Sequence, residues 1–88
     1  MSGTQPVVHV LAIVDGVSEE TVEVVTFQSF LERDFHLQFD VDPKRDPGML
    51  DRYSVGPDDV DFLGKYLESV VEFDFAQFAY FIEALRDE

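Results

Sequence analysis

Histidine and serine side chains are the groups in this sequence with the greatest potential for acid–base or nucleophilic chemistry. His9 lies within an apolar run, where a histidine usually has a hydrogen-bonded structural role, and His36 lies near the predicted end of a helix, where it complements the helix dipole. Ser29, Ser54 and Ser69 belong to no recognisable nucleophile motif. A general base also needs an orienting partner and a nucleophile within reach. We therefore predict no catalytic residue and no enzymatic activity.

One acidic loop loosely matches the spacing of a calcium-binding loop, with acids at Asp40, Asp42 and Asp46. Lys44 occupies a ligand position and Arg45 replaces the glycine that the sharp turn requires, so two positive charges would repel the metal. Cysteine is absent, which excludes a disulfide and a thiolate zinc site. We therefore interpret these acids as solvated and predict no metal and no other cofactor.

Negative charge dominates the composition, with 19 acidic and 6 basic residues and a formal net charge of −13. This charge repels nucleic acid and anionic membranes, because binding to phosphates depends on Lys and Arg. It also speeds the encounter with basic protein surfaces. We therefore predict a basic protein partner and neither a nucleic-acid nor a membrane partner, with solubility as the alternative explanation of the charge. The predicted partner-binding residues are the acids that crowd the second half: Asp40, Asp42, Asp46, Asp51, Asp58, Asp59, Asp61, Glu68, Glu72 and Asp74.

The first half of the chain indicates a β-hairpin followed by a helix. The β-branched run 7–14 predicts a strand, Asp15-Gly16 predicts a turn, and the loose alternation over 20–27 predicts a second strand. The chain then changes to helical spacing, and we expect a short helix that ends near residue 36 or 37. Its apolar face consists of Phe27, Phe30, Leu31 and Phe35.

The second half begins with an irregular loop, because two prolines and a glycine between residues 40 and 48 prevent regular structure. The segment 52–55 predicts a short strand. Pro57 then fits the first turn of a helix, and the acids that follow it favour the positive end of the helix dipole. The apolar face of this helix consists of Val60, Leu63, Tyr66, Leu67 and Val70.

The C-terminal segment is compatible with either a helix or a strand. Asp74 could cap a helix, because apolar residues follow it at helical spacing. Alternatively, the continuous apolar run 78–85 could form a buried strand beside the first strand, 7–14. Alanine and glutamine favour the helix, whereas the aromatic residues favour the strand.

Together these elements predict an α+β fold. A small antiparallel sheet, made of the hairpin, a short middle strand and a possible C-terminal strand, packs with two or three helices. We expect a disordered N-terminus over residues 1–6 and a single α+β domain over 7–88, because 88 residues leave no room for two independent cores. The sequence predicts neither a signal peptide nor a transmembrane helix, so we expect a cytoplasmic protein.

Four short motifs stand out in the C-terminal half: Asp51-x-Tyr53-x-Val55-x-Pro57, Phe62-Leu63-x-x-Tyr66-Leu67, Phe73-Asp74-Phe75 and Tyr80-Phe81-Ile82-Glu83-Ala84. With them the chain resembles, from about residue 10 to its end, a family of short acidic bacterial proteins regarded as immunity-type proteins beside secreted polymorphic toxins. Lys44 and Arg45 depart from the acidic turn of that family. The family implies no catalytic residues, and its Tyr-Phe-x-Glu-Ala ending favours a C-terminal strand.

The charge and the resemblance lead to the hypothesis of an immunity protein that binds a cognate toxin. A toxin with a basic active-site cleft, such as a nuclease, would be blocked by steric and electrostatic occlusion. Two alternatives remain open: a nucleic-acid mimic that inhibits a DNA-binding or defence enzyme, and an acidic structural or regulatory subunit. A homodimer formed through an exposed strand edge also remains open.

Overall fold

An N-terminal hairpin forms one side of the sheet in the computed structural model, which describes residues 7–86. Strand β1 (Val7–Asp15) pairs antiparallel with strand β2 (Thr21–Thr26), with a register shift between Ile13 and Val14. The β-branched composition of both segments suits the pleated, half-buried surface of a sheet. The predicted hairpin is therefore confirmed.

The turn between these strands is built by Asp15 and Gly16. The Asp15 carboxylate accepts the N–H of Ser18 at 3.0 Å and of Val17 at 2.8 Å, and these bonds lower the pKa of Asp15. The N–H of Gly16 donates to the carbonyl oxygen of Gln77 at 2.9 Å, and a Cβ at Gly16 would lie 2.9 Å from that same oxygen. This close backbone approach explains why glycine occupies the turn.

The C-terminal apolar run forms a central strand, β4 (Phe78–Arg86), and not a helix. Its residues pair antiparallel with β1 along their whole length, from Val7 with Arg86 to Asp15 with Phe78. The short strand β3 (Tyr53–Val55) pairs with the other side of β4, so the strand order is β2-β1-β4-β3. Neighbouring strands on both sides satisfy the backbone hydrogen bonds of β4, which makes it a central strand of the sheet.

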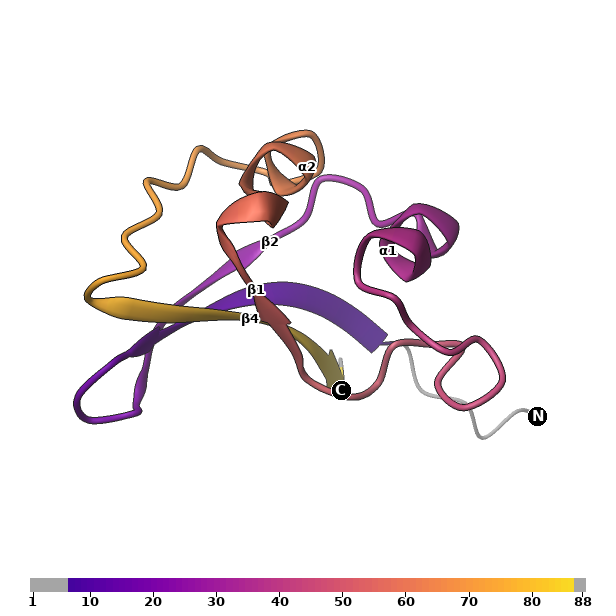
Figure 1. Ribbon diagram of the computed structural model, residues 1–88, viewed down its shortest axis with the longest axis horizontal. Helices are drawn as coiled ribbons and strands as arrows, with labels where there is room; N and C mark the ends of the chain where they lie inside the picture. The colour runs from indigo at the N-terminus through magenta and orange to yellow at the C-terminus, as the bar shows by residue number, and fades with distance from the viewer. Residues whose placement is uncertain (1–6, 87–88) are drawn as a thin grey trace.

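Three short helical elements lie over one face of this sheet (Figure 1). Helix α1 (Glu32–Gln38) follows β2, and the 3-10 turn η1 (Pro57–Asp59) leads into helix α2 (Val60–Gly64). The antiparallel sheet and the two helices form an α+β fold, as predicted. No helix within residues 7–86 is long and apolar enough to cross a membrane. The predicted disordered segment 1–6 lies outside the described residues.

Both helices are shorter than predicted, and one backbone contact explains why. Phe27 and Leu67 form an isolated antiparallel bridge, which two N–H···O bonds of 2.6 and 3.0 Å flank. A bridge needs extended backbone, so α1 begins only at Glu32 and α2 has already ended at Gly64. Val70, predicted to lie on the apolar face of the second helix, is instead 95% exposed.

The core between the sheet and the helices is rich in aromatic rings. Phe35 of α1 is fully buried, and its ring centroid lies 4.0 Å from that of Phe30 and 4.9 Å from that of Phe62. Leu11 and Ile82, which face each other across β1 and β4, close the core from below. Because each buried ring removes on the order of 150–250 Å² from water, these contacts supply much of the stability of so short a chain.

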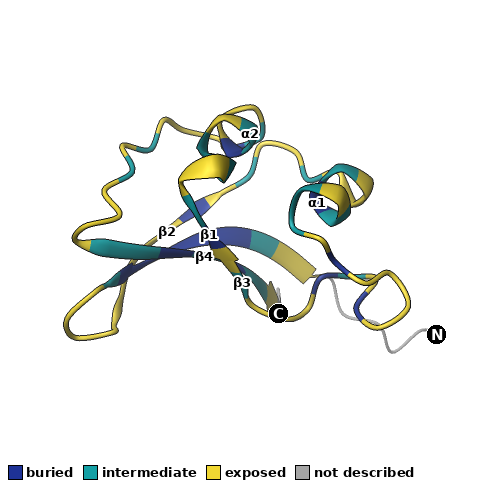
Figure 2. Ribbon diagram, viewed as in Figure 1, coloured by how far each residue is buried: buried dark blue, intermediate teal, exposed yellow. Residues whose placement is uncertain are grey.

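The opposite face of the sheet has no helix over it in the part of the chain that the structure describes (Figures 1 and 2). Val10, Ala12 and Val14 alternate with the core residues of β1 and therefore point to this face. All three are buried, because side chains of the neighbouring strands shield them. Val24, which lies opposite Ala12 on β2, is 47% exposed.

Candidate partner-binding surface

The ten acids predicted to bind a partner lie in three segments and do not form one patch. Four belong to the loop between α1 and β3, named here the 40–51 loop. Three belong to η1 and α2, and three to the connection between α2 and β4, named here the 68–74 segment. In Figure 1 the 40–51 loop lies at one end of the molecule, the 68–74 segment lies toward the other end, and η1 and α2 lie between them.

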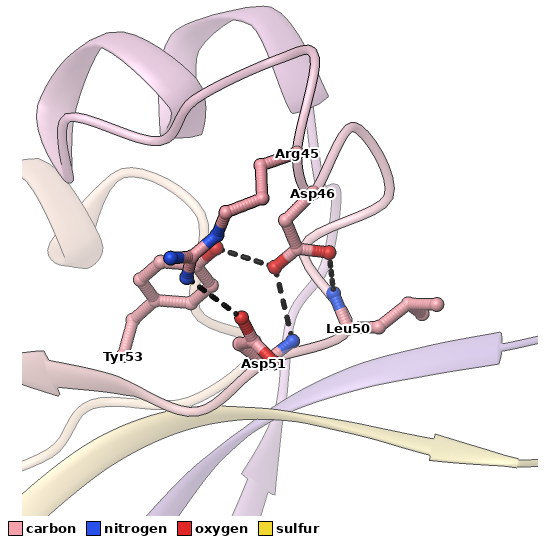
Figure 3. A network of polar contacts seen from close by, with 5 residues as sticks. All are labelled: Arg45, Asp46, Leu50, Asp51 and Tyr53. Carbon is pink, nitrogen blue, oxygen red and sulfur yellow. Dashed lines mark hydrogen bonds and ion pairs between the residues drawn. The ribbon is translucent and has the colours of Figure 1, made fainter.

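Asp46 of the 40–51 loop is the one charged side chain among the described residues that is buried, with 7% of its surface exposed. Its carboxylate accepts the N–H of Leu50 at 2.8 Å, the N–H of Asp51 at 3.0 Å and the phenol O–H of Tyr53 (Figure 3). A buried carboxylate that accepts three hydrogen bonds is satisfied internally. This placement fits a structural role that closes the loop, and it does not fit the predicted contact with a partner.

The protonation states of Asp46 and Tyr53 follow from this network. Burial raises the pKa of Asp46, but the hydrogen bonds from Tyr53, Leu50 and Asp51, with the positive charge of Arg45, outweigh burial and leave the pKa lowered. Burial and the hydrogen bond to the Asp46 carboxylate raise the pKa of Tyr53 to about 12. Asp46 is therefore ionised and Tyr53 protonated at neutral pH, which keeps donor and acceptor matched.

Both histidines fasten the same loop from neighbouring elements. His9 in β1 donates from Nε2 to the carbonyl oxygens of Gly48 at 2.9 Å and Met49 at 3.1 Å. His36, in the last turn of α1, donates from Nε2 to the carbonyl oxygen of Pro47 at 2.8 Å. A carbonyl oxygen can only accept, so Nε2 carries the proton in both rings. His9 thus has the hydrogen-bonded structural role predicted for it.

The other acids of the 40–51 loop are exposed, and two of them have partners within the loop. Asp42 accepts the N–H of Lys44 at 2.9 Å, and Asp51 forms an ion pair with Arg45 at 3.1 Å. Asp40 has a φ of 54°, a left-handed conformation that Asp adopts more readily than most residues. Within residues 7–86, no three His, Cys, Asp or Glu side chains gather closely enough to hold a metal ion.

The acids of η1 and α2 divide into one structural residue and two exposed residues. Asp59 is half-buried and accepts the N–H of Gly56 at 2.8 Å and the side-chain amide of Gln38 at 2.7 Å. The second bond ties η1 to α1. Asp58 and Asp61 are exposed, and neither belongs to an ion pair in the described part of the chain. These two carboxylates therefore add negative charge to the helix side of the molecule.

The 68–74 segment packs Val71 and Phe73 against the core and presents its acids and Val70 to solvent. Glu68 accepts the hydroxyl of Thr26 at 3.0 Å, while Glu72 and Asp74 are exposed, and Asp74 caps a turn through one backbone N–H at 3.1 Å. Val70 lies between them and, at 95%, is the most exposed large hydrophobic side chain that the structure describes. An exposed apolar residue flanked along the chain by carboxylates has the composition of an interface centre with a polar rim.

Two shallow hollows border this segment. One of about 230 Å³ lies between the segment and β2, where Val22 and Val71 contribute to its lining. The other, of about 270 Å³, lies between the segment and α2, where Val60 and Phe73 contribute. Both are smaller than the roughly 300–1,000 Å³ of typical small-molecule sites, so they suit side chains of a protein partner better than a free ligand.

The structure places eight of the ten predicted acids in exposed positions, Asp59 in a half-buried position and Asp46 in the interior. The role of Asp46 was missed, although an acid directly before Pro47-Gly48 is a signal of a turn that the acid can stabilise. Val70 was missed because the helical pattern assigned it to the core. Comparison with family models, curated proteins and solved structures finds no significant match to this chain.

Proposed function

We propose that this protein is an immunity-type binding protein that neutralises a toxin domain with a basic cleft, such as a nuclease. The observation that carries the proposal is the 68–74 segment, where the exposed Val70 is flanked along the chain by acids in a protein of net charge −13. A basic partner would pair Lys and Arg with those carboxylates and bury the valine at the centre of the contact. The resemblance of the C-terminal motifs to immunity-type proteins supports a toxin over other basic proteins.

In this proposal the protein acts by blocking the cleft of the toxin and catalyses no reaction. Its two histidines are committed to carbonyl oxygens of the 40–51 loop, and Asp46 is committed to Tyr53. The large negative charge steers a basic toxin toward it and raises the association rate, so the toxin is captured before it reaches nucleic acid. Capture takes place in the cytoplasm in this proposal, a compartment that the absence of cysteine suits.

A nucleic-acid mimic is the second candidate, and the spread of the exposed acids favours it. These acids run from the 40–51 loop past η1 and α2 to the 68–74 segment, over much of the length of the molecule (Figure 1). A mimic would use this whole row in place of phosphates. The exposed Val70 favours the first candidate, because a substitute for phosphates needs no apolar centre.

Matched charge-removal variants test the contact. One variant, Glu68→Gln/Glu72→Gln/Asp74→Asn, removes three charges around Val70 and keeps the hydrogen-bond acceptors. The control, Asp40→Asn/Asp42→Asn/Asp51→Asn, removes three charges from the other end. Each variant is tested for binding to a tagged toxin domain encoded beside the gene of this protein. Each variant is also co-expressed with that domain to test whether it protects the cells.

We expect the control to bind and protect like the wild type, and the 68–74 variant to lose affinity at least about tenfold. Equal losses in both variants would favour the mimic, and full retention in both would refute the electrostatic contact. The association rate of the wild type should also fall at least about tenfold between low and physiological salt. Val70→Ser should instead raise the dissociation rate with little effect on association.

A further inference from the structure

The sheet face opposite the helices is the main feature that the proposed function does not use. Residues paired directly across antiparallel strands share a face, so Val8 lies beside Leu85 and Ala12 beside Phe81 there. Val8 is 38% exposed, Leu85 is 42% exposed, and Val24 on the β2 edge is 47% exposed. In Figure 2 the helices lie on the other side of the sheet, so this apolar row has no covering layer among the described elements.

The strand residues of this face carry balanced charge, unlike the rest of the molecule. Arg52 forms an ion pair with Glu83 at 2.8 Å, and its guanidinium carbon lies 3.8 Å from the centre of the Phe81 ring. Arg52 and Glu83 are the single base and the single acid among the described strand residues that alternation places on this face, with Arg52 beside them. Glu68 adds one further carboxylate at the β2 edge, where it accepts the hydroxyl of Thr26, which pairs with Val10. A basic partner would find little net attraction here, whereas the acids of the helix side would attract it.

We propose that this face packs against the same face of a second copy of the chain, as one sheet on another. A twofold arrangement is self-complementary, because each copy presents one Arg52 and one Glu83, and each can reach the opposite charge on its partner. The exposed Val8, Val24 and Leu85 would then leave water together. In a protein of net charge −13, a face with one base and two acids is a surface on which two copies repel each other weakly.

The size of the face predicts how strong this association is. With a rise of about 3.4 Å per residue and strands about 4.8 Å apart, the four strands cover a flat area of roughly 450 Å² per copy. Side-chain relief adds to this, so two copies bury on the order of 1,000 Å² in total. That value exceeds most crystal contacts and lies just below standard specific interfaces, so we expect a weak, reversible dimer.

Such a dimer differs from the contact with a basic partner in the surface that it uses and in its response to salt. The helix side of each copy stays outside, so the dimer presents two separate 68–74 segments. Two copies of net charge −13 repel each other, so added salt tightens the dimer by screening. The same salt weakens the contact with a basic partner. The two contacts can therefore fail independently in experiments.

Sedimentation velocity of the whole protein, over about 5–500 µM, tests the proposal. Val24→Glu and Leu85→Glu place a carboxylate at two ends of the face. Val17→Glu is the matched control, because Val17 lies in the hairpin turn, away from the face, and is 94% exposed. Circular dichroism and thermal melting establish that each variant is folded at the temperature of the measurement.

We expect the wild type and Val17→Glu to pass from monomer to dimer within this range, and more readily at high salt. Each face variant should need at least about tenfold more protein to dimerise. A wild type that stays monomeric at the highest concentration overturns the proposal. Dimers that resist both face variants also overturn it, and in that case a proline placed at the β2 edge would test pairing through the strand edge instead.

Discussion

The 40–51 loop and the 68–74 segment are both irregular, rich in acids and free of repetitive structure, but they are organised in opposite ways. The 40–51 loop is held from within, because Asp46 accepts three hydrogen bonds and two histidines bind its carbonyl oxygens. The 68–74 segment leaves Val70 almost completely in solvent and most of its carboxylates outward. With a similar composition, the 40–51 loop is stabilised by its own contacts, whereas the 68–74 segment, as we propose, binds a partner.

The difference comes from the supply of donors around each carboxylate. Asp46 lies within reach of two backbone N–H groups and a phenol, so burying its charge is favourable. Glu72 has no such neighbours among the described residues and stays in water. A count of acids therefore says little about binding until each carboxylate is placed relative to its donors.

Replacing the central carboxylate of the 40–51 loop should have the largest effect on stability. Asp46→Ala leaves two N–H groups and a phenol without their acceptor, and we expect a loss of about 2–4 kcal/mol in the free energy of unfolding. Urea denaturation measures the loss. Asp40→Asn in the same loop, at an exposed residue, is the control and should change the value by less than about 0.5 kcal/mol. Similar values for both variants would contradict the structural role of Asp46.

Removing the phenol hydroxyl should have a smaller effect. Tyr53→Phe deletes one of three donors to Asp46 and keeps the ring, so we expect a loss of about 1–2 kcal/mol. Spectroscopic titration of the wild type should show a tyrosine that ionises near the value of about 12 set by burial and by the Asp46 carboxylate, and this ionisation should be absent from Tyr53→Phe. If all the tyrosines ionise near pH 10, the contact between Tyr53 and Asp46 does not persist in solution.

The pH dependence of stability should carry the signature of the lowered pKa of Asp46. Between the folded and unfolded pKa values the unfolded chain binds more protons, so stability rises with pH there. The contribution of Asp46 is therefore complete above its unfolded pKa of about 4 and is lost as the pH falls through the lower folded value. Subtracting the unfolding free energies of Asp46→Asn from those of the wild type, at each pH from about 2 to 6, isolates this term. A difference that does not change with pH would argue against it.

Substitution at the centre of the 68–74 segment should have the smallest effect on stability. Val70→Ser changes a side chain that is 95% exposed, so we expect a change within about 0.5 kcal/mol in thermal or urea unfolding. Leu67→Ala, three residues earlier and buried, should in contrast cost about 2–4 kcal/mol. A strongly destabilising Val70→Ser would mean that the segment packs inward, and would remove the basis for placing the contact there.

Local pattern was sufficient for several elements. The β-branched runs around Asp15-Gly16 predicted the hairpin, because strand periodicity and turn chemistry act over a few residues. The segment 52–55 predicted β3 in the same way. The exposed acids were also predictable in kind, since ionised carboxylates rarely leave water without partners.

The sequence by itself determined an acidic α+β domain with an N-terminal hairpin, a short middle strand and aromatic residues for the core. Tertiary structure decided the rest through contacts between distant residues. The bridge between Phe27 and Leu67 shortened both helices, and pairing with β1 made a strand of an apolar run that could also have been a helix. Hydrogen-bond donors around Asp46 allow its carboxylate to be buried. Because helix α2 ends earlier than predicted, Val70 is exposed to solvent. Periodicity describes only neighbours along the chain, whereas the helix ends and strand β4 depend on partners 40 or more residues away, such as Phe27 and Leu67. The donors to Asp46 lie only four to seven residues from it, but they meet the carboxylate through the path of an irregular loop, which periodicity does not describe.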